Sequence, residues 1–313
     1  MSRITGFVSI LLVLAACNQP NTVVTSTTST TTQPTSTTGQ DTGFPVTVTV
    51  GGVDITLDER PTSIVSLSPT ATETLFAIGA GDQVVAVDEI SDYPAEAPTT
   101  DLSGLTPNIE AIAEFDPDLI VVGFDPDSII TESFSALGVP VVVQAPAVDR
   151  DGVLAQIEQL GALTGHLDAA VAITADMAAR WDEANKVDAA GTRVYIEIDS
   201  TLYSASSSSF MGSVLVPMGF VNIADEADVD GWGFPQLSDE WVVSSDPQLI
   251  ILGSDSGVTA DDIAARPGWD VISAVVNSNI VVIDSDLSSR WGPRFIEYVE
   301  RMAELANSLA SAP

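Results

Sequence analysis

Apolar residues along this chain follow two alternating patterns. A short apolar run at positions 64–67 is followed by a Ser-Pro pair, then by a helical pattern from about Thr70 to Ile78, and then by a second apolar run at 84–87. Short runs rich in Val and Ile predict buried strands, whereas three- and four-residue spacing predicts helices. Strands that alternate with helices are typical of parallel sheets with helices on both faces.

Two segments of the chain have nearly the same sequence. FDPDLIVVG occupies positions 115–123 and SDPQLIILG occupies 245–253, and at the same offset Glu110 lies opposite Glu240. In each copy a capping residue opens a short helix, an Asp-Pro pair ends it, and an apolar run follows as a buried strand. Asp-Pro before an apolar run is a common junction, but the matching acidic positions indicate two related helix–turn–strand units. The expected capping residues are Thr106 or Asn108 in the first copy and Ser238 in the second.

The start of the second half repeats the strand and helix pattern of the first. A strand is expected within 192–199, a serine-rich loop follows it, a helix is expected over 210–219, and an extended segment at 220–224. Each half therefore predicts one lobe with its own sheet.

A long stretch with helical spacing separates the two halves. Gly165 interrupts the stretch, so we expect one helix before it and a second over 166–187. At 1.5 Å per residue the second helix spans roughly 30 Å, about the width of a small domain. The apolar positions are Leu154, Ile157 and Leu160 in the first helix, then Leu167, Val171, Met177 and Trp181 in the second.

These patterns predict an α/β fold of two lobes, each a mainly parallel sheet flanked by helices, joined by one long rigid helix. The expected boundaries are 45–165 for the N-terminal lobe, 166–187 for the linking helix and 188–313 for the C-terminal lobe. A chain of 313 residues, 45% of them hydrophobic, exceeds one typical domain, which agrees with this division.

The first 17 residues do not fit either lobe. Arg3 precedes an apolar run that ends at Leu14-Ala15-Ala16-Cys17, a sequence that resembles a bacterial lipobox. We expect 1–17 to be a lipoprotein signal peptide and Cys17 to carry a lipid, with an ordinary signal peptide and an incidental cysteine as the alternative. The segment 18–44 is rich in Thr and Ser and predicts a disordered stalk. The expected location is extracytoplasmic, with the chain lipid-anchored to the cell membrane.

The charge balance narrows the range of partners. The chain has 44 acidic and 10 basic residues, a net charge of −34, so nucleic acid is not an expected partner. A strongly hydrated acidic surface explains this charge without a specific cationic partner. Because Cys17 is the only cysteine, the sequence predicts no intrachain disulfide and no thiolate metal site.

Several motifs in order resemble the helical-backbone substrate-binding proteins of ABC importers, which carry cobalamin, ferric siderophores or haem. The resemblance covers about residues 45–310 and includes RPTSIVSLSPTATETLFAIGAGDQVVAV, SDYP, NIEAIAEFDPDLIVVG, FPQLSDEW and GPRFIEYVERMAELA. It implies a ligand held in a cleft between two lobes, delivery to an ABC permease dimer, and a monomeric protein. It implies no catalytic residue, no resident metal and no covalent cofactor.

The resemblance also assigns roles to individual residues. Glu110 and Glu240 take the positions of two carboxylates that dock on permease arginines, although each could simply be an acid favoured at a helix N-terminus. Aromatic residues and arginines near turns take the positions that face the ligand, with core packing, or for Arg290 the capping of a surface turn, as the alternative. The implied ligand-binding residues are Tyr203, Trp232, Phe234, Asp286, Arg290, Trp291 and Arg294.

The ligand itself stays open between a cobalt corrinoid and a ferric chelate. Ile90 stands where the cobalamin-binding branch has a tyrosine, and DLSGLTPN lacks a tryptophan of that branch, so two stacking surfaces are missing. A ferric siderophore therefore remains an alternative, with Arg290 and Arg294 as partners for its anionic oxygens.

Two other classes of protein compete with this interpretation. A stalked adhesion or scaffold module would explain the tether and the acidity, but not the paired glutamates. A secreted hydrolase would need a base, and His166 is the only histidine, at a helix junction that suits capping or packing. No G-x-S-x-G motif occurs, and GSDSG at 253–257 has Asp255 at its centre. The single histidine also argues against the zinc and manganese binding proteins.

Overall fold

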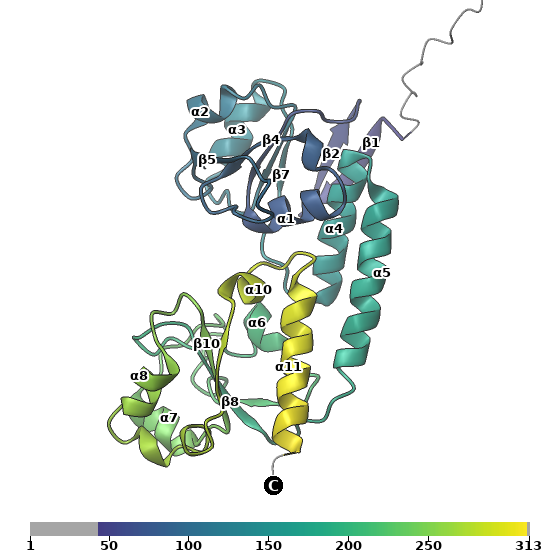
Figure 1. Ribbon diagram of the computed structural model, residues 1–313. Coiled ribbons are helices and arrows are strands. Elements are labelled where there is room, and N and C mark those ends of the chain that lie inside the picture. The colour runs from purple at the N-terminus through teal and green to yellow at the C-terminus, as the bar shows by residue number, and fades with distance from the viewer. Residues whose placement is uncertain (1–42, 312–313) are drawn as a thin grey trace, which may run out of the picture. The chain divides into compact units, whose positions relative to one another are not determined.

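The computed structural model describes residues 43–311, which belong to one compact unit spanning Asp41–Pro313. The predicted signal peptide, the lipidation site at Cys17 and the stalk up to residue 42 lie outside the described residues. The described chain is an α/β protein with two parallel sheets and one antiparallel hairpin (Figure 1). No helix within 43–311 is long and apolar enough to cross a membrane.

The first half forms a five-stranded parallel sheet with the strand order β5-β4-β3-β6-β7. The central strand β3 and its neighbour β6 are buried at every residue, as expected for a parallel sheet covered on both faces. A hairpin of β1 and β2 precedes the sheet. The strands are β1 (Val46–Val50), β2 (Val53–Leu57), β3 (Ile64–Leu67), β4 (Val84–Asp88), β5 (Thr99–Leu102), β6 (Leu119–Val122) and β7 (Val141–Val143).

Alternate residues of the central strands bury against opposite helix layers. Ile64 and Leu119 face the cluster that includes the helix after β3 and the long helix after β7, whereas Val65 and Ile120 face the cluster that includes Ile112. This two-residue alternation places helices on both faces of the sheet. The elements of this half are α1 (Pro69–Ala77), the short 3-10 helix η1 (Gly81–Gln83), α2 (Ile109–Ala113), α3 (Ile129–Ser135) and α4 (Arg150–Thr164).

The second half forms a four-stranded parallel sheet with the order β11-β10-β8-β9. The strands are β8 (Arg193–Glu197), β9 (Val221–Asn222), β10 (Leu249–Gly253) and β11 (Ile280–Ile283). The helices are α6 (Phe210–Ser213), α7 (Asp239–Ser245), α8 (Ala260–Ala265), η2 (Trp269–Val271), α9 (Ser273–Val276), α10 (Ser285–Ser289) and α11 (Phe295–Ala310).

Between the sheets, α4 and α5 (Leu167–Ala184) run antiparallel and pack closely. Gly165 ends α4 in the left-handed conformation, and a Cβ added at Gly161 would come within 2.4 Å of the Ala170 Cβ, so only glycine allows this approach. At the end of the helix pair away from Gly165, Arg150 of α4 forms an ion pair with Asp182 of α5 (2.6 Å).

Helix α11 packs along the later part of α5. The rings of Trp181 and Phe295 lie 5.7 Å apart, and Arg180 donates to both carboxylate oxygens of Glu300 at 2.8 and 2.7 Å. These hydrogen bonds lower the pKa of Glu300. The linking helix is therefore flanked by α4 and by α11.

Two helix expectations need correction. The helix expected over 210–219 ends at Ser213, since Pro217 lacks the N–H that a continuing helix needs. In α5, Leu167 and Val171 are exposed, because the buried face consists of Ala170, Thr174, Met177, Trp181 and Ala184. Small residues supply the early part of this face, and a count of large apolar residues misses them.

The two similar segments at 115–123 and 245–253 belong to two matching structural units. The Asn108 side chain caps α2 and the Ser238 side chain caps α7, each by accepting from backbone N–H groups of the first turn. After each helix an aspartate adopts a positive φ, 48° at Asp116 and 45° at Asp246, and a buried strand follows. The predicted helix–turn–strand units are thus confirmed, including their caps.

Candidate functional site

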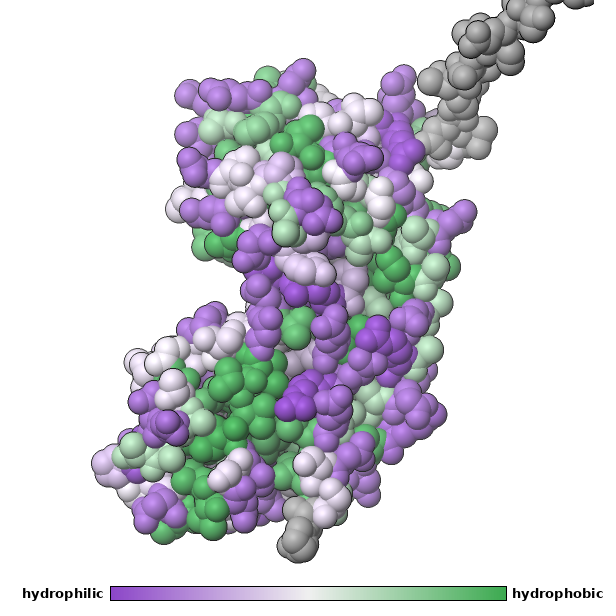
Figure 2. Space-filling view, in the orientation of Figure 1, coloured by the Kyte–Doolittle hydropathy of each residue, from purple (hydrophilic) through white to green (hydrophobic). Residues whose placement is uncertain are grey.

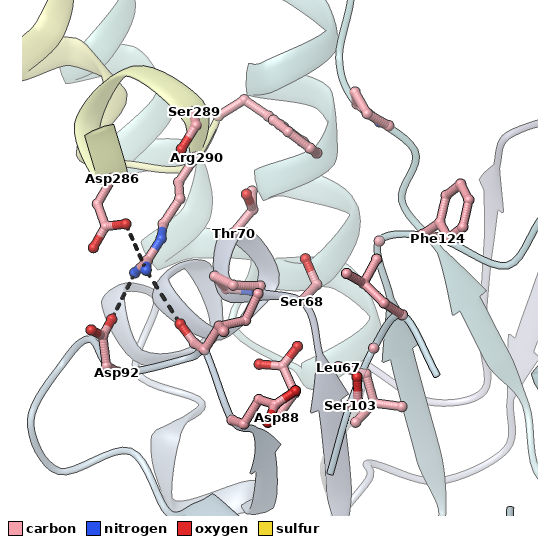
Figure 3. A pocket seen from close by; sticks show the side chains of 18 residues that line it. Leu67, Ser68, Thr70, Asp88, Asp92, Ser103, Phe124, Asp286, Ser289 and Arg290 are labelled. Atoms are coloured by element: carbon pink, nitrogen blue, oxygen red, sulfur yellow. Dashed lines mark hydrogen bonds and ion pairs between the residues drawn. The ribbon is translucent and has the colours of Figure 1, made fainter. Parts of the chain in front are cut away.

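A cavity with a volume of about 650 Å³ lies where strands of the first sheet end (Figure 3). Carboxyl ends of parallel strands are the usual ligand site of open α/β sheets. The C-terminal segment around α10 completes the wall. The lining residues are Leu67, Ser68, Pro69, Thr70, Asp88, Glu89, Ile90, Asp92, Ser103, Gly104, Leu105, Gly123, Phe124, Pro146, Asp286, Ser289, Arg290 and Trp291.

The cavity wall includes apolar side chains that are exposed. Ile90 is 54% exposed, Phe124 54% and Leu105 71%. In the space-filling view hydrophilic residues cover much of this face of the molecule, with apolar patches between them (Figure 2). Exposed apolar groups gathered at a cavity are typical of a binding surface.

A second, smaller cavity of about 140 Å³ lies at the corresponding edge of the second sheet. Ile198, Met211 and Tyr298 contribute to its wall, and burial raises the pKa of Tyr298. Both cavities are lined by Ser289 at the end of α10. Helix α10 therefore lies between the two cavities.

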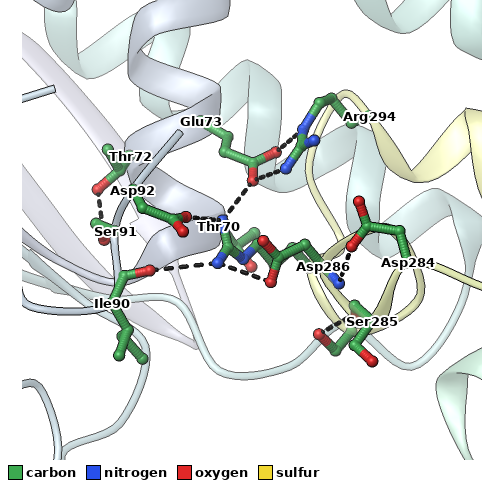
Figure 4. Close-up of polar contacts among 12 residues, drawn as sticks. Thr70, Thr72, Glu73, Ile90, Ser91, Asp92, Asp284, Ser285, Asp286 and Arg294 are labelled. Carbon is green, nitrogen blue, oxygen red and sulfur yellow. Dashed lines mark hydrogen bonds and ion pairs between the residues drawn. The ribbon is translucent and has the colours of Figure 1, made fainter. Parts of the chain in front are cut away.

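Arg290 connects α10 to the first half of the chain. It donates to Glu73 Oε1 at 3.0 Å, to Asp92 Oδ1 at 3.1 Å and to the Ile90 carbonyl at 3.2 Å, and it forms an ion pair with Asp286 at 2.7 Å (Figure 4). The residue is only 9% exposed. Its guanidinium is surrounded by three carboxylates of the protein itself.

Arg294 shares the same central carboxylate. Its Nε and Nη2 donate to the two oxygens of Glu73 at 2.8 and 2.6 Å, and its guanidinium lies 3.7 Å from the centre of the Tyr93 ring. Hydrogen bonds to Glu73 raise the pKa of Arg294. Glu73, 3% exposed on α1, thus holds two arginines that lie 217 and 221 positions away in the sequence.

Two polar groups at the large cavity lack a hydrogen-bond partner. Asp88 is 1% exposed and its Oδ1 accepts no hydrogen bond, while the indole Nε1 of Trp291 is buried and donates none. Burial raises the pKa of Asp88, although hydrogen bonds from Ser91 oppose the shift. Because both atoms are fully buried, neither adds accessible polar surface to the cavity wall.

The structure brings together only part of the ligand-binding set implied by the resemblance. Asp286, Arg290 and Trp291 line the large cavity, whereas Arg294 lies behind Arg290 on Glu73. The other three residues are not among its lining residues. Tyr203 forms a β-bridge to Gln236, and Trp232, 68% exposed, contacts Phe234 edge to face at 5.6 Å. Their role in binding a ligand stays a prediction.

Sequence reasoning missed Glu73 and the apolar wall of the cavity. Every residue of α1 from Thr70 to Leu75 is buried, so the one acid in this helix signals a buried partner. Leu105 and Phe124 gave no signal, because a single apolar residue beside a strand resembles a core residue. Ile90, noted in the sequence for its lost aromatic ring, does line the cavity.

The two glutamates with a predicted docking role are both exposed. Glu110 lies in the first turn of α2 and Glu240 in the first turn of α7, the helices of the two matching units. Their placement agrees with either interpretation made from the sequence, and docking stays a prediction.

His166 lies apart from the large cavity. It is the first residue before α5, and its ring contacts Arg60 at 2.8 Å and Thr164 at 3.3 Å. Within residues 43–311 no group of three or more His, Cys, Asp or Glu side chains is arranged to hold a metal ion.

Comparison with known proteins gives a consistent result. Residues 64–287 match the periplasmic binding protein family. A cobalamin-binding protein of Halobacterium salinarum is 32% identical over 277 residues, covering 83% of this chain and 73% of the relative.

Two solved structures are similar in fold and sequence. The periplasmic vitamin B12 binding protein of Vibrio cholerae has 25% identity and a TM-score of 0.66, with 80% of this chain and 98% of that chain covered. A protein of an ABC-type Fe³⁺-hydroxamate transport system from Saccharomonospora viridis has 26% identity and a TM-score of 0.64, covering 84% and 99%.

Proposed function

Because this chain belongs to the periplasmic binding protein family, we propose that it captures a corrinoid or a ferric chelate outside the cytoplasm and delivers it to an ABC importer. The observation that carries the proposal is the cavity of about 650 Å³ at the strand ends, with its exposed apolar wall. Its volume lies within the usual range of small-molecule sites, about 300–1,000 Å³.

The composition of the wall supports a large ligand with apolar faces and polar edges. Phe124 and Trp291 offer flat surfaces, and the Ser103 hydroxyl and the Glu89 carboxylate offer polar groups. A ligand larger than the first cavity could extend across α10 toward the second, since the two share Ser289. The name of the H. salinarum relative favours a corrinoid, and that of the S. viridis structure keeps a ferric hydroxamate as the alternative.

Binding without covalent chemistry agrees with the groups at the site. The hydroxyls of Ser68, Ser103 and Ser289 line the large cavity, but its wall has no histidine or lysine that could act as their base. His166, the residue that a hydrolase would require, contacts Arg60 instead. We therefore propose a carrier that releases its ligand unchanged.

The route of delivery completes the proposal. Glu110 and Glu240 would dock on a permease dimer through their exposed carboxylates, and lipidation at Cys17 would keep a single monomeric copy close to the membrane. The lobes would span 45–165 and 188–313, with 166–187 between them.

Isothermal titration calorimetry with cyanocobalamin, ferrioxamine B and haem tests the ligand. Saturable binding of one of them is expected, and Phe124→Ala should weaken it by about tenfold, since truncation of an aromatic that contacts the ligand removes stacking surface. Val216→Ala is the matched control, because Val216 is similarly exposed at 55% but does not line the cavity. Absence of binding by all three ligands would contradict the proposal.

A further inference from the structure

The large cavity is lined by more acidic than basic side chains. Four carboxylates line it, from Asp88, Glu89, Asp92 and Asp286, against the single guanidinium of Arg290. Glu89 is exposed and lies directly after β4. An approaching ligand therefore meets more negative than positive charge at this wall.

The positive charge of Arg290 is already paired with carboxylates of the protein. Its guanidinium contacts Glu73, Asp92 and Asp286, and Arg294 behind it contacts the same Glu73. A ligand oxyanion could recruit Arg290 only by displacing one of these carboxylates. If Glu73 were displaced, a carboxylate only 3% exposed would lose a partner, which is unfavourable in a buried site.

The acidic wall defines what the ligand should offer instead. The exposed carboxylate of Glu89 can accept hydrogen bonds from a ligand N–H, but it cannot donate to a ligand oxyanion. A carboxamide carries an uncharged acceptor oxygen and, when primary or secondary, an N–H donor. In a ferric hydroxamate chelate the negative charges of the hydroxamates are neutralised by Fe³⁺. A ligand carboxylate would place another negative charge beside Asp88, Glu89 and Asp92.

We propose that this wall selects uncharged or cationic metal chelates with amide-like edges and rejects polyanionic ones such as catecholate or polycarboxylate chelates. The inference rests on the proposed function, because it names the class of ligand for the same cavity. Glu89 is the specificity-determining residue that is easiest to test alone, since within residues 43–311 its exposed carboxylate makes no ion pair and no hydrogen bond.

The test compares ligands of one shape and different charge. Calorimetry would measure the dissociation constants of cyanocobalamin and of its derivatives in which one, two or three peripheral amides are hydrolysed to carboxylates. Ferrioxamine B, a cation, and ferric enterobactin, a trianion, form a second pair. Each added carboxylate should weaken binding by about tenfold at low salt, because like charges across a binding site are unfavourable, and salt should reduce the effect.

Two variants make the test specific to the wall. Glu89→Gln should reduce the penalty for each added carboxylate, while its matched control Glu96→Gln, an exposed glutamate outside the cavity, should leave the penalty unchanged. Equal affinity for the amide and the tricarboxylate forms, or an unchanged penalty in Glu89→Gln, would overturn the charge selection alone. Failure of every chelate to bind would overturn the proposed function and this inference with it.

Discussion

Replacing Glu73 by glutamine should destabilise the protein by removing one charge from the group of Glu73, Arg290 and Arg294. The side chain of Glu73 is 2% exposed, and those of Arg290 and Arg294 are 10% and 20% exposed. Glutamine keeps the size and one acceptor oxygen, so the substitution tests charge more than packing. Loss of one partner from a buried ion pair costs about 3–5 kcal/mol of unfolding free energy.

The contacts place the expected effect at the lower end of that range. Without the charge of Glu73, Arg290 still contacts Asp92 and Asp286, so its own charge stays compensated. Arg294 loses its ion-pair partner and keeps the one oxygen of the glutamine and the face of the Tyr93 ring, 3.7 Å away, which is worth about 0.5–2 kcal/mol. We therefore expect a loss of about 3 kcal/mol in Glu73→Gln.

Urea unfolding followed by tryptophan fluorescence measures this loss, and calorimetry should show a fall in Tm of about 6–12 °C, at about 2–4 °C per kcal/mol. Glu300→Gln is the matched control, because its partner Arg180 is 38% exposed and Glu300 is 39% exposed. Such an exposed pair contributes at most about 1 kcal/mol. If Glu73→Gln cost no more than Glu300→Gln, the proposed strength of the buried group would be refuted.

Two further predictions concern docking and pH. Glu110→Ala combined with Glu240→Ala should stop uptake of the ligand by cells and leave the dissociation constant of the ligand unchanged. Glu114→Ala, an exposed control beside α2, should change neither uptake nor affinity. A loss of affinity in the double variant would argue against docking. The second prediction rests on the pKa of Asp246, which the backbone N–H of Ser273 lowers most. A lowered pKa gives stability that is fully present above the ordinary pKa of an aspartate and is lost in acid, as the pH falls through the ordinary value and then through the lowered one. Asp246→Asn, which tolerates the positive φ, should flatten this part of the stability profile in urea unfolding, and an unchanged acid limb would contradict the assignment.

Local patterns in the sequence predicted most of the fold. The strand at 64–67, the caps at Asn108 and Ser238, and the repeated units follow from spacing and side-chain chemistry within a few residues. The shortened α6 and the small buried residues of α5 were missed, because backbone breaks and helix faces without large apolar residues give weak signals.

The site was less predictable because its contacts are long-range. Asp286, Arg290 and Trp291 were found through resemblance to a family, and all three line the cavity. Glu73 was missed because nothing near it in the sequence reveals a partner 217 positions away. For the same reason the sequence did not predict that Arg290 is already paired within the protein. This pairing bears on the kind of ligand proposed for the cavity.

The packing around α5 has a mechanical consequence. Arg150 of α4 forms an ion pair with Asp182, and Arg180, two residues earlier in α5, forms one with Glu300 of α11. Near its C-terminal end the linking element is thus a bundle of three helices instead of one rod, and bending stiffness rises steeply with the thickness of a bundle. Wide opening there would have to shear α4 and α11 past α5 and separate Trp181 from Phe295. Exchange of ligand is therefore expected to depend on small local displacements of the cavity wall around Ile90, Leu105 and Phe124. A large rotation of one half of the chain about the helices is not expected to be needed.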